Sequence, residues 1–302
     1  FSQIQYTLGE KWNFTGGLSI NNQSYRYKRL TDPGSGYVDK SIHAIVTPRL
    51  AVLYRLTKDV SAYMVAAKGF SPPALAELRP SDGNYYGDLL AEYGWNYEAG
   101  IKGEIMNQRL QFDIAAYSFK LQNAIVRRNN AAGAEYFVNA GGTKQKGVEA
   151  LIKYQLLKKA ESFFSVLNLW SSYSYQPYRF ENYQQAAINY SGNELTGVPR
   201  NIWISGLDIE TVKGFYLDAS INYTSSLPLT DANDAYAEAY RLMQVKLGYH
   251  CKQKRGQFNI FAGIDNLLNE NYSLGNDINA AGKRYYNPSA GRNFFAGIQL
   301  RI

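Results

Sequence analysis

The chain has 302 residues, 45% of them hydrophobic, and a formal net charge of +7. Its mean hydropathy is −0.36 and the sequence contains no run of about 18 apolar residues, which excludes a membrane-spanning helix. The single cysteine, Cys251, excludes an intrachain disulfide and a cysteine-based metal site, and the two histidines lie far apart. Lys and Arg are scattered and often lie at turns, so the charge does not indicate nucleic-acid binding.

Apolar and polar residues alternate throughout the chain in segments of about ten residues, which is typical of membrane-spanning strands. In the last segment, Asn293–Ile302, one face holds apolar residues only and the other face is mixed. The apolar face holds Phe294, Ala296, Ile298, Leu300 and Ile302, and the mixed face holds Phe295, Gly297, Gln299 and Arg301. The pattern predicts about thirteen strands. They are expected at Ser2–Leu8, from Trp12, Ala44–Leu56, Val60–Gly69, Trp95–Glu104, from Leu110, up to Tyr154, Phe163–Tyr175, Asn201–Glu210, Phe215–Tyr223, Tyr240–His250, Gln257–Asp265 and Asn293–Ile302.

The connections between these strands alternate between short turns, such as Thr57–Asp59, and long polar loops, such as Phe70–Tyr93 and Gln176–Gly197. One loop holds the turn-rich run Asp32–Gly36, and a tight turn is expected at Cys251–Gly256. Outer-membrane barrels sort their connections in this way, with short turns in the periplasm and long loops outside the cell. We therefore expect an all-β antiparallel transmembrane β-barrel rather than a soluble β-sandwich.

The segment Gln257–Asp265 shows the expected facing most clearly. Its apolar residues should face lipid, and the alternating set should face the lumen. The lipid-facing set is Phe258, Ile260, Ala262 and Ile264, and the lumen-facing set includes Asn259, Phe261 and Asp265.

Six motifs, in order along the chain, resemble the strand borders of TonB-dependent outer-membrane receptors, in particular ferric-siderophore receptors. They are KGFSPP at Lys68–Pro73, EYGWNYEAG at Glu92–Gly100, NAGGT with GVE at Asn139–Thr143 and Gly147–Glu149, VPRN at Val198–Asn201, DNLLNENY at Asp265–Tyr272, and YNP with GR at Tyr286–Pro288 and Gly291–Arg292. The chain departs from the family at Ile302, where an aromatic residue usually ends the last strand.

The resemblance implies that residues 1–302 are the C-terminal portion of a 22-stranded barrel, with the plug domain and the N-terminal strands absent. The protein would then lie in the outer membrane of a Gram-negative bacterium, in contact with outer-membrane lipid. It would take up a ferric siderophore, energised by the TonB complex through the absent N-terminal part, without a cofactor or enzymatic activity. The alternatives are a receptor for another bulky nutrient, such as cobalamin or a glycan, and a passive porin or adhesin.

No catalytic constellation emerges from the sequence, and carboxylate pairs such as Asp231 and Asp234 are interpreted as solvated loop residues. Ligand binding is expected in the long loops, because Arg and Tyr suit anionic, aromatic siderophores by charge and stacking. The predicted ligand-binding residues are Arg79, Tyr85, Tyr86, Arg127, Arg128, Lys283, Arg284, Tyr285 and Tyr286. The Arg127–Arg128 and Lys283–Tyr286 clusters should line the outer vestibule without needing to touch each other.

Overall fold

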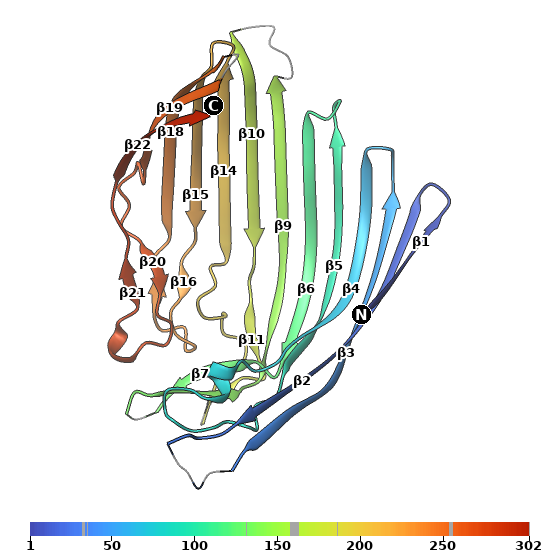
Figure 1. Cartoon of the computed structure of the whole chain (residues 1–302), viewed down its shortest axis with the longest axis vertical. Coiled ribbons are helices and arrows are strands. Elements are labelled where there is room, and N and C mark those ends of the chain that lie inside the picture. The colour runs from blue at the N-terminus through green and yellow to red at the C-terminus, as the bar shows by residue number, and fades with distance from the viewer. Residues whose placement is uncertain are drawn as a thin grey trace.

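The computed structural model describes residues 1–301 except 32–33, 35, 131, 158–162, 186 and 254–255. Its main feature is one antiparallel sheet of 14 strands, of which thirteen follow one another in chain order and the remaining one, β11 (Arg179–Glu181), pairs with β9. The path consists of β1 (Ser2–Leu8), β2 (Trp12–Tyr27), β3 (Val38–Arg55), β4 (Val60–Ser71), β5 (Glu92–Ile105), β6 (Leu110–Gln122), β9 (Gly142–Leu157), β10 (Phe164–Tyr175), β14 (Asn201–Thr211), β15 (Phe215–Thr224), β18 (Tyr240–Gln253), β19 (Gly256–Asp265) and β22 (Asn293–Arg301). Figure 1 shows this sheet as a curved wall, with β1 at one edge and β22 at the other.

The thirteen predicted strands are confirmed, and β2 and β3 are longer than expected. Beyond a register shift the two strands continue to pair from Gln23 opposite Ile42 to Tyr27 opposite Val38. These segments carry polar residues on both faces. The alternation of apolar and polar residues that predicts a strand is therefore missing from their sequence, although their backbones pair.

Some sequence predictions fall at the gaps in the structure. Of the expected turn Asp32–Gly36, Asp32, Pro33 and Ser35 lie outside the described residues, as does Ile302. The expected turn Cys251–Gly256 is shorter than predicted, because β18 runs to Gln253 and β19 begins at Gly256.

The sheet has an apolar face and a polar face, as the alternation in β19 predicts. Phe258 and Ile260 are exposed on the apolar face. Asn259 and Phe261 lie on the polar face. Asn259 Oδ1 accepts a 3.1 Å hydrogen bond from Tyr216 Oη, and the Lys246 ammonium lies 5.3 Å from the ring centroid of Phe261. The predicted separation of the two sets of side chains is therefore confirmed.

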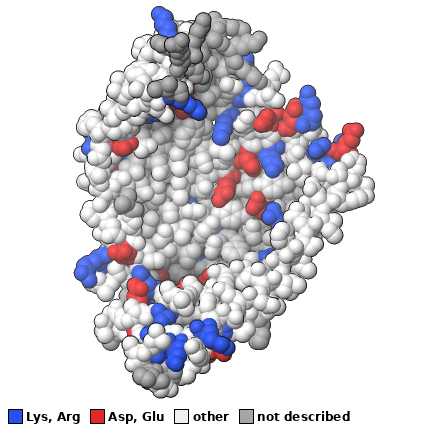
Figure 2. All heavy atoms as spheres, viewed as in Figure 1, with Lys and Arg blue, Asp and Glu red and all other residues white. Residues whose placement is uncertain are grey.

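The polar face carries charged side chains along the middle of the strands, and Figure 2 shows acidic and basic groups over the middle of the sheet. Lys246 Nζ lies 3.3 Å from Asp218 Oδ2. Nearer the tight turns, His250 Nε2 lies 3.1 Å from Glu210 Oε1. Within the described part of the chain, no group of three or more His, Cys, Asp and Glu residues is placed to hold a metal ion.

Aromatic rings on the polar face lie directly over glycines of the neighbouring strand. Gly206 pairs with Trp170, and a Cβ atom at Gly206 would lie 2.3 Å from the indole ring. Gly248 is covered by Tyr216 in the same way, again with 2.3 Å to the ring. The glycines therefore let large rings lie flat against a tightly curved wall.

The long loops gather at one end of the sheet and the tight turns at the other (Figure 1). This loop end contains α1 (Leu75–Leu78), β7 (Ile125–Asn129) with β8 (Glu135–Asn139), β12 (Gln184–Gln185) with β13 (Ile188–Asn189), β16 (Leu227–Pro228) with β17 (Tyr236–Ala237), β20 (Ser273–Asn276) with β21 (Tyr286–Pro288), and η1 (Ala281–Lys283). The loop predicted around Arg127–Ala134 begins later than expected, because Arg127 and Arg128 lie in β7 and pair with β8 in a short hairpin. Neither described helix is long and apolar enough to cross a membrane.

The interior of the molecule also lies at the loop end. The largest fully buried side chains of the described residues are Tyr183, Leu78, Leu229, Pro73 and Pro228. Leu78 is the last residue of α1, and the others lie in loops or short loop strands. The wall leaves both of its faces open, whereas the loops pack against one another.

Candidate functional site

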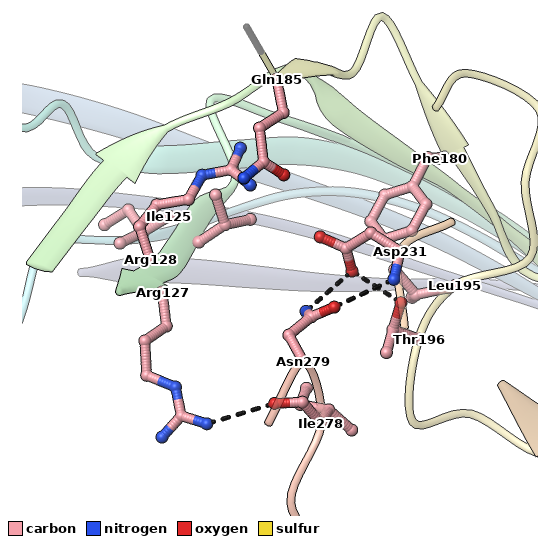
Figure 3. A pocket seen from close by; sticks show the side chains of 11 residues that line it. Ile125, Arg127, Arg128, Phe180, Gln185, Leu195, Thr196, Asp231, Ile278 and Asn279 are labelled. Atoms are coloured by element: carbon pink, nitrogen blue, oxygen red, sulfur yellow. Dashed lines mark hydrogen bonds between the residues drawn. The ribbon is translucent and has the colours of Figure 1, made fainter. Parts of the chain in front are cut away.

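A cavity of about 430 Å³ opens between the loops, and four chain segments line it. The β7 strand supplies Arg127 and Arg128, and the long connection between β11 and β14, which includes β12, supplies Gln185 and Thr196. The connection between β16 and β17 supplies Asp231, and the last long loop supplies Asn279. Figure 3 shows these side chains converging from elements that are distant in the sequence.

Asp231 is the centre of the hydrogen-bond network beside this cavity. Its carboxylate accepts bonds from Tyr183 Oη at 2.6 Å, Thr196 Oγ1 at 2.7 Å and Asn279 Nδ2 at 3.0 Å. Its backbone N–H donates to Asn279 Oδ1 at 3.0 Å, and its carbonyl accepts from Asn193 Nδ2 at 2.8 Å. Asp231 therefore fastens three loops together, and the interpretation of this residue as a solvated loop carboxylate is wrong.

Burial explains why Tyr183 serves this network as a donor. The side chain is fully buried, and this burial raises the pKa of the Tyr183 phenol above its ordinary value. The phenol therefore keeps its proton and donates a hydrogen bond to Asp231. A neutral donor paired with a carboxylate gives a charge-assisted hydrogen bond within the loop core.

Arg127 and Arg128 lie side by side in β7 and differ in their partners. Arg127 Nη1 lies 2.8 Å from Glu135 Oε1, and its Nη2 donates to the carbonyl of Ile278 at 3.4 Å. The guanidinium of Arg128 lies 5.2 Å from the ring centroid of Tyr183 and has no ion pair among the described residues. Arg128 therefore offers the cavity a positive charge that no carboxylate of the described residues neutralises through an ion pair.

Arg79 and Tyr85 contact β2 rather than the cavity. Arg79 Nε donates to Tyr27 Oη at 2.7 Å, and its guanidinium lies 5.2 Å from the centre of the Tyr27 ring. The ring of Tyr85 also stacks on Tyr27, with 5.1 Å between the ring centroids. These contacts fix loop 72–91 to the end of β2, and the predicted ligand contact of Arg79 and Tyr85 stays a prediction.

Tyr86 fixes the same loop to β8. Its ring stacks on Tyr136 at 6.0 Å, and its hydroxyl donates to the carboxylate of Asp82. This hydrogen bond holds the pKa of Asp82 below its ordinary value. Tyr86 therefore also has a structural partner at the loop end.

The last long loop reaches the cavity with residues other than those predicted. Tyr285 is buried against Leu229 and Ala237, while Tyr286 Oη donates to the carbonyl of Tyr236 at 3.4 Å. Lys283 and Arg284 are exposed and do not line the cavity. The two predicted clusters thus do not touch each other.

Sequence reasoning missed Gln185, Thr196, Ile278 and Asn279 as lining residues. Ile278 nevertheless meets Arg127 through its carbonyl (Figure 3). The one local signal is that Asn279 has a positive φ of 52°, a conformation that Asn tolerates better than most residues. Asn is common in loops, however, so this signal alone would not have located the cavity.

Comparison with known proteins assigns this architecture. The family model described as "TonB dependent receptor-like, beta-barrel" matches residues 1–267. The metal-pseudopaline receptor CntO of Pseudomonas aeruginosa strain UCBPP-PA14 is 26% identical over 208 residues, which cover 66% of this chain and 26% of that receptor. The ferric-pyoverdine 358 receptor of Pseudomonas putida is 29% identical over 170 residues, covering 51% of this chain and 20% of the receptor.

Solved structures share the fold over nearly the whole chain. The ferric yersiniabactin uptake receptor FyuA from Yersinia pestis superposes with a TM-score of 0.75 at 20% identity, covering 99% of this chain and 44% of that structure. The unliganded ferric citrate transporter FecA superposes with a TM-score of 0.77 at 16% identity, covering 96% of this chain and 42% of that structure. The chain thus spans less than half of these structures and about a quarter of the curated receptor CntO. It belongs to the TonB-dependent receptor β-barrel family, a family of Gram-negative outer-membrane proteins.

Proposed function

We propose that the chain is the C-terminal portion of the barrel of an active transporter that takes up an iron–siderophore complex with energy supplied through TonB. The observation that carries the proposal is the cavity at the loop end, where Arg128 faces an opening large enough for part of a chelate. In this family the long loops face the outside of the cell, so the cavity lies where a ligand arrives first.

The charges around the cavity favour an anionic ligand. Arg128 is not neutralised by a described carboxylate, and the side chain of Arg127 stays partly exposed beside its ion pair with Glu135. Asp231, the acidic lining residue, is already occupied by Tyr183, Thr196 and Asn279. A negatively charged chelate would therefore meet donors rather than free carboxylates.

The remaining part of the proposal concerns the protein beyond these residues. A single-chain barrel of the bacterial outer membrane has an even number of strands, and plugged transporters of this kind have 22. We therefore propose that about nine further strands and a plug domain complete the receptor, and that the plug carries the contact with TonB.

The relatives support a second candidate, uptake of a different metal complex. CntO is described as a metal-pseudopaline receptor, and a copper transporter, OprC, has the same fold with a TM-score of 0.74 at 15% identity, covering 99% of this chain and 47% of that structure. Both candidates place the ligand in the same cavity and differ in the metal and its chelator.

Uptake by the full-length receptor tests the proposal. A strain lacking its own siderophore receptors would express the protein and receive radiolabelled ferric complexes of several siderophores, together with copper, nickel and zinc complexes. The proposal expects uptake of a ferric complex that stops when TonB is deleted. Preferred uptake of another metal complex would establish the second candidate, and TonB-independent passage of small solutes would identify a passive pore instead.

A further inference from the structure

A row of four basic side chains and one tryptophan crosses five adjacent strands near the loop end of the wall. Strand register places directly paired residues in β4, β5, β6, β9 and β11 at the same height. In that order they are Lys68, Trp95, Lys120, Lys144 and Arg179, which we call the basic row.

The basic row lies on the apolar face rather than the polar one. Side chains of a strand alternate between faces, so Lys68 shares a face with Met64, and Lys144 shares one with Val148. Met64 and Val148 are both exposed, as apolar residues that face lipid would be. On the opposite face of β9, Lys153 pairs with Gln111.

Toward the middle of the wall the charges decrease at one height and are absent at the next. The next height in register holds Ala66, Tyr97, Ser118 and Lys146. The height after that holds Met64, Ala99, Ala116, Val148 and Tyr175, none of which is charged. Basic groups thus border an apolar band at the end that faces the outside of the cell, and Trp95 and Tyr97 lie at the boundary, as aromatic residues do at a membrane interface.

Few carboxylates neutralise this border. Lys120 Nζ lies 2.9 Å from Glu181 Oε2, whereas the Lys68 ammonium lies over the ring of Tyr93 at 5.3 Å. Arg179 donates to the backbone carbonyl of Gly192. In the part of the chain that the structure describes, the exposed side chains of Lys144 and Lys146 have no ion-pair partner.

We propose that the basic row, together with Lys146, binds the phosphate groups of a phosphorylated lipid in the outer leaflet. Its acyl chains would lie along the apolar band next to Met64 and Val148, and its phosphates would meet Lys144, Lys146 and Arg179. Charge complementarity carries this assignment, because an ammonium row at the edge of a lipid-facing surface has an anionic headgroup as its natural partner. The surface faces away from the cavity, so the lipid does not compete with the transported ligand.

The expected affinity follows from the number of charges. Each basic side chain near an anionic membrane surface strengthens association by about fivefold. Removing both Lys144 and Lys146 should therefore weaken binding by about twentyfold, and the difference should shrink as salt rises.

Lipid titration of the full-length receptor in neutral detergent tests this site. The probe is bisphosphorylated lipid A in the same detergent, and the readout is the dissociation constant. The test variant is Lys144→Gln/Lys146→Gln. The matched control, Lys102→Gln/Lys153→Gln, removes two lysines from the polar face of β5 and β9, and its affinity should stay within about twofold of the wild type.

The proposal expects the loss in the first variant alone, and expects Lys144→Arg/Lys146→Arg to retain binding because the charges remain. An unchanged affinity in the Gln variant would overturn it, and so would equal binding of lipid A stripped of its phosphates. Complete competition by inorganic phosphate at the lipid's own concentration would assign the row to a free anion instead. If the Gln variant does not fold, the dephosphorylated lipid and the Arg variant still decide the outcome.

Discussion

The wall of strands and the loop end are stabilised by different interactions. In the wall, continuous backbone ladders join neighbours, and rings such as Trp170 lie against glycines such as Gly206. At the loop end, the chain folds around buried side chains, and Asp231 and Tyr183 join segments 48 residues apart. A substitution in the wall should therefore act according to the face it lies on, whereas one at the loop end should act according to the hydrogen bond it removes.

Accessibility of the two ends should give an all-or-none difference. An epitope tag inserted in the β12–β13 hairpin should be labelled by antibody on intact cells, because this hairpin lies at the loop end, which faces outward in this family. A tag in the tight turn Thr57–Asp59 should be labelled only after the outer membrane is permeabilised. The reverse labelling pattern would invert the topology.

A charge on the apolar face of the wall should cost the most stability. Ile260 lies in the middle of β19, so Ile260→Arg should lower the free energy of unfolding by about 2–4 kcal/mol. Its neighbour on the polar face provides the control, and Asn259→Arg should cost much less. Denaturant titration of the full-length barrel refolded in lipid vesicles measures both, and equal losses would contradict the facing of β19.

A methyl group added under a ring of the wall should cost somewhat less. Gly206→Ala places its Cβ against Trp170 and should destabilise the barrel by about 1–3 kcal/mol through overpacking. Gly16→Ala is the control, because the nearest atom to its Cβ would be a Leu50 methyl at 3.8 Å. Thermal unfolding in detergent should separate the two variants, and a shared melting temperature would show that the ring of Trp170 moves aside easily.

Loss of the Asp231 carboxylate should loosen the loop end without unfolding the wall. In Asp231→Ala, the buried hydroxyl of Tyr183 loses its acceptor, at a local cost of about 1–3 kcal/mol. Asp234→Ala in the same loop should have little effect, because Asp234 is exposed and accepts from Thr230 within its own turn. Hydrogen exchange should rise around residues 183–197 and 277–280 in the first variant alone. Equal exchange in both variants would show that Asp231 does not hold the loops.

The wall could be predicted from the sequence because its information is local. Alternation such as Phe258–Asp265 and short polar turns place each strand without knowledge of its partner. The loop end could not, because its contacts join residues without any periodic pattern. The contact of Arg79 with Tyr27 could not be predicted, because Tyr27 lies in the polar part of β2, where the sequence shows no strand pattern. The hydrogen bond between Tyr183 and Asp231 joins two separate loops. Arg127 and Arg128 were selected for their charge alone, and both line the cavity, but their contact with a ligand stays a prediction.

The central claim is that the cavity, rather than the loop end in general, captures an anionic ligand. It is tested most directly by the equilibrium affinity of the full-length receptor for its native ferric complex, at low and high salt. The test variant is Arg127→Ala/Arg128→Ala. The control, Lys283→Ala/Arg284→Ala, also removes two positive charges from the loop end, but from residues that do not line the cavity.

The cavity variant should bind about tenfold more weakly at low salt, with a smaller loss at high salt, because salt screens exposed charges. The control variant should bind as the unchanged receptor does at both salt concentrations. Equal weakening of the two variants would show a diffuse effect of net charge, and unchanged affinity in the cavity variant would contradict the assignment of Arg127 and Arg128 to ligand capture.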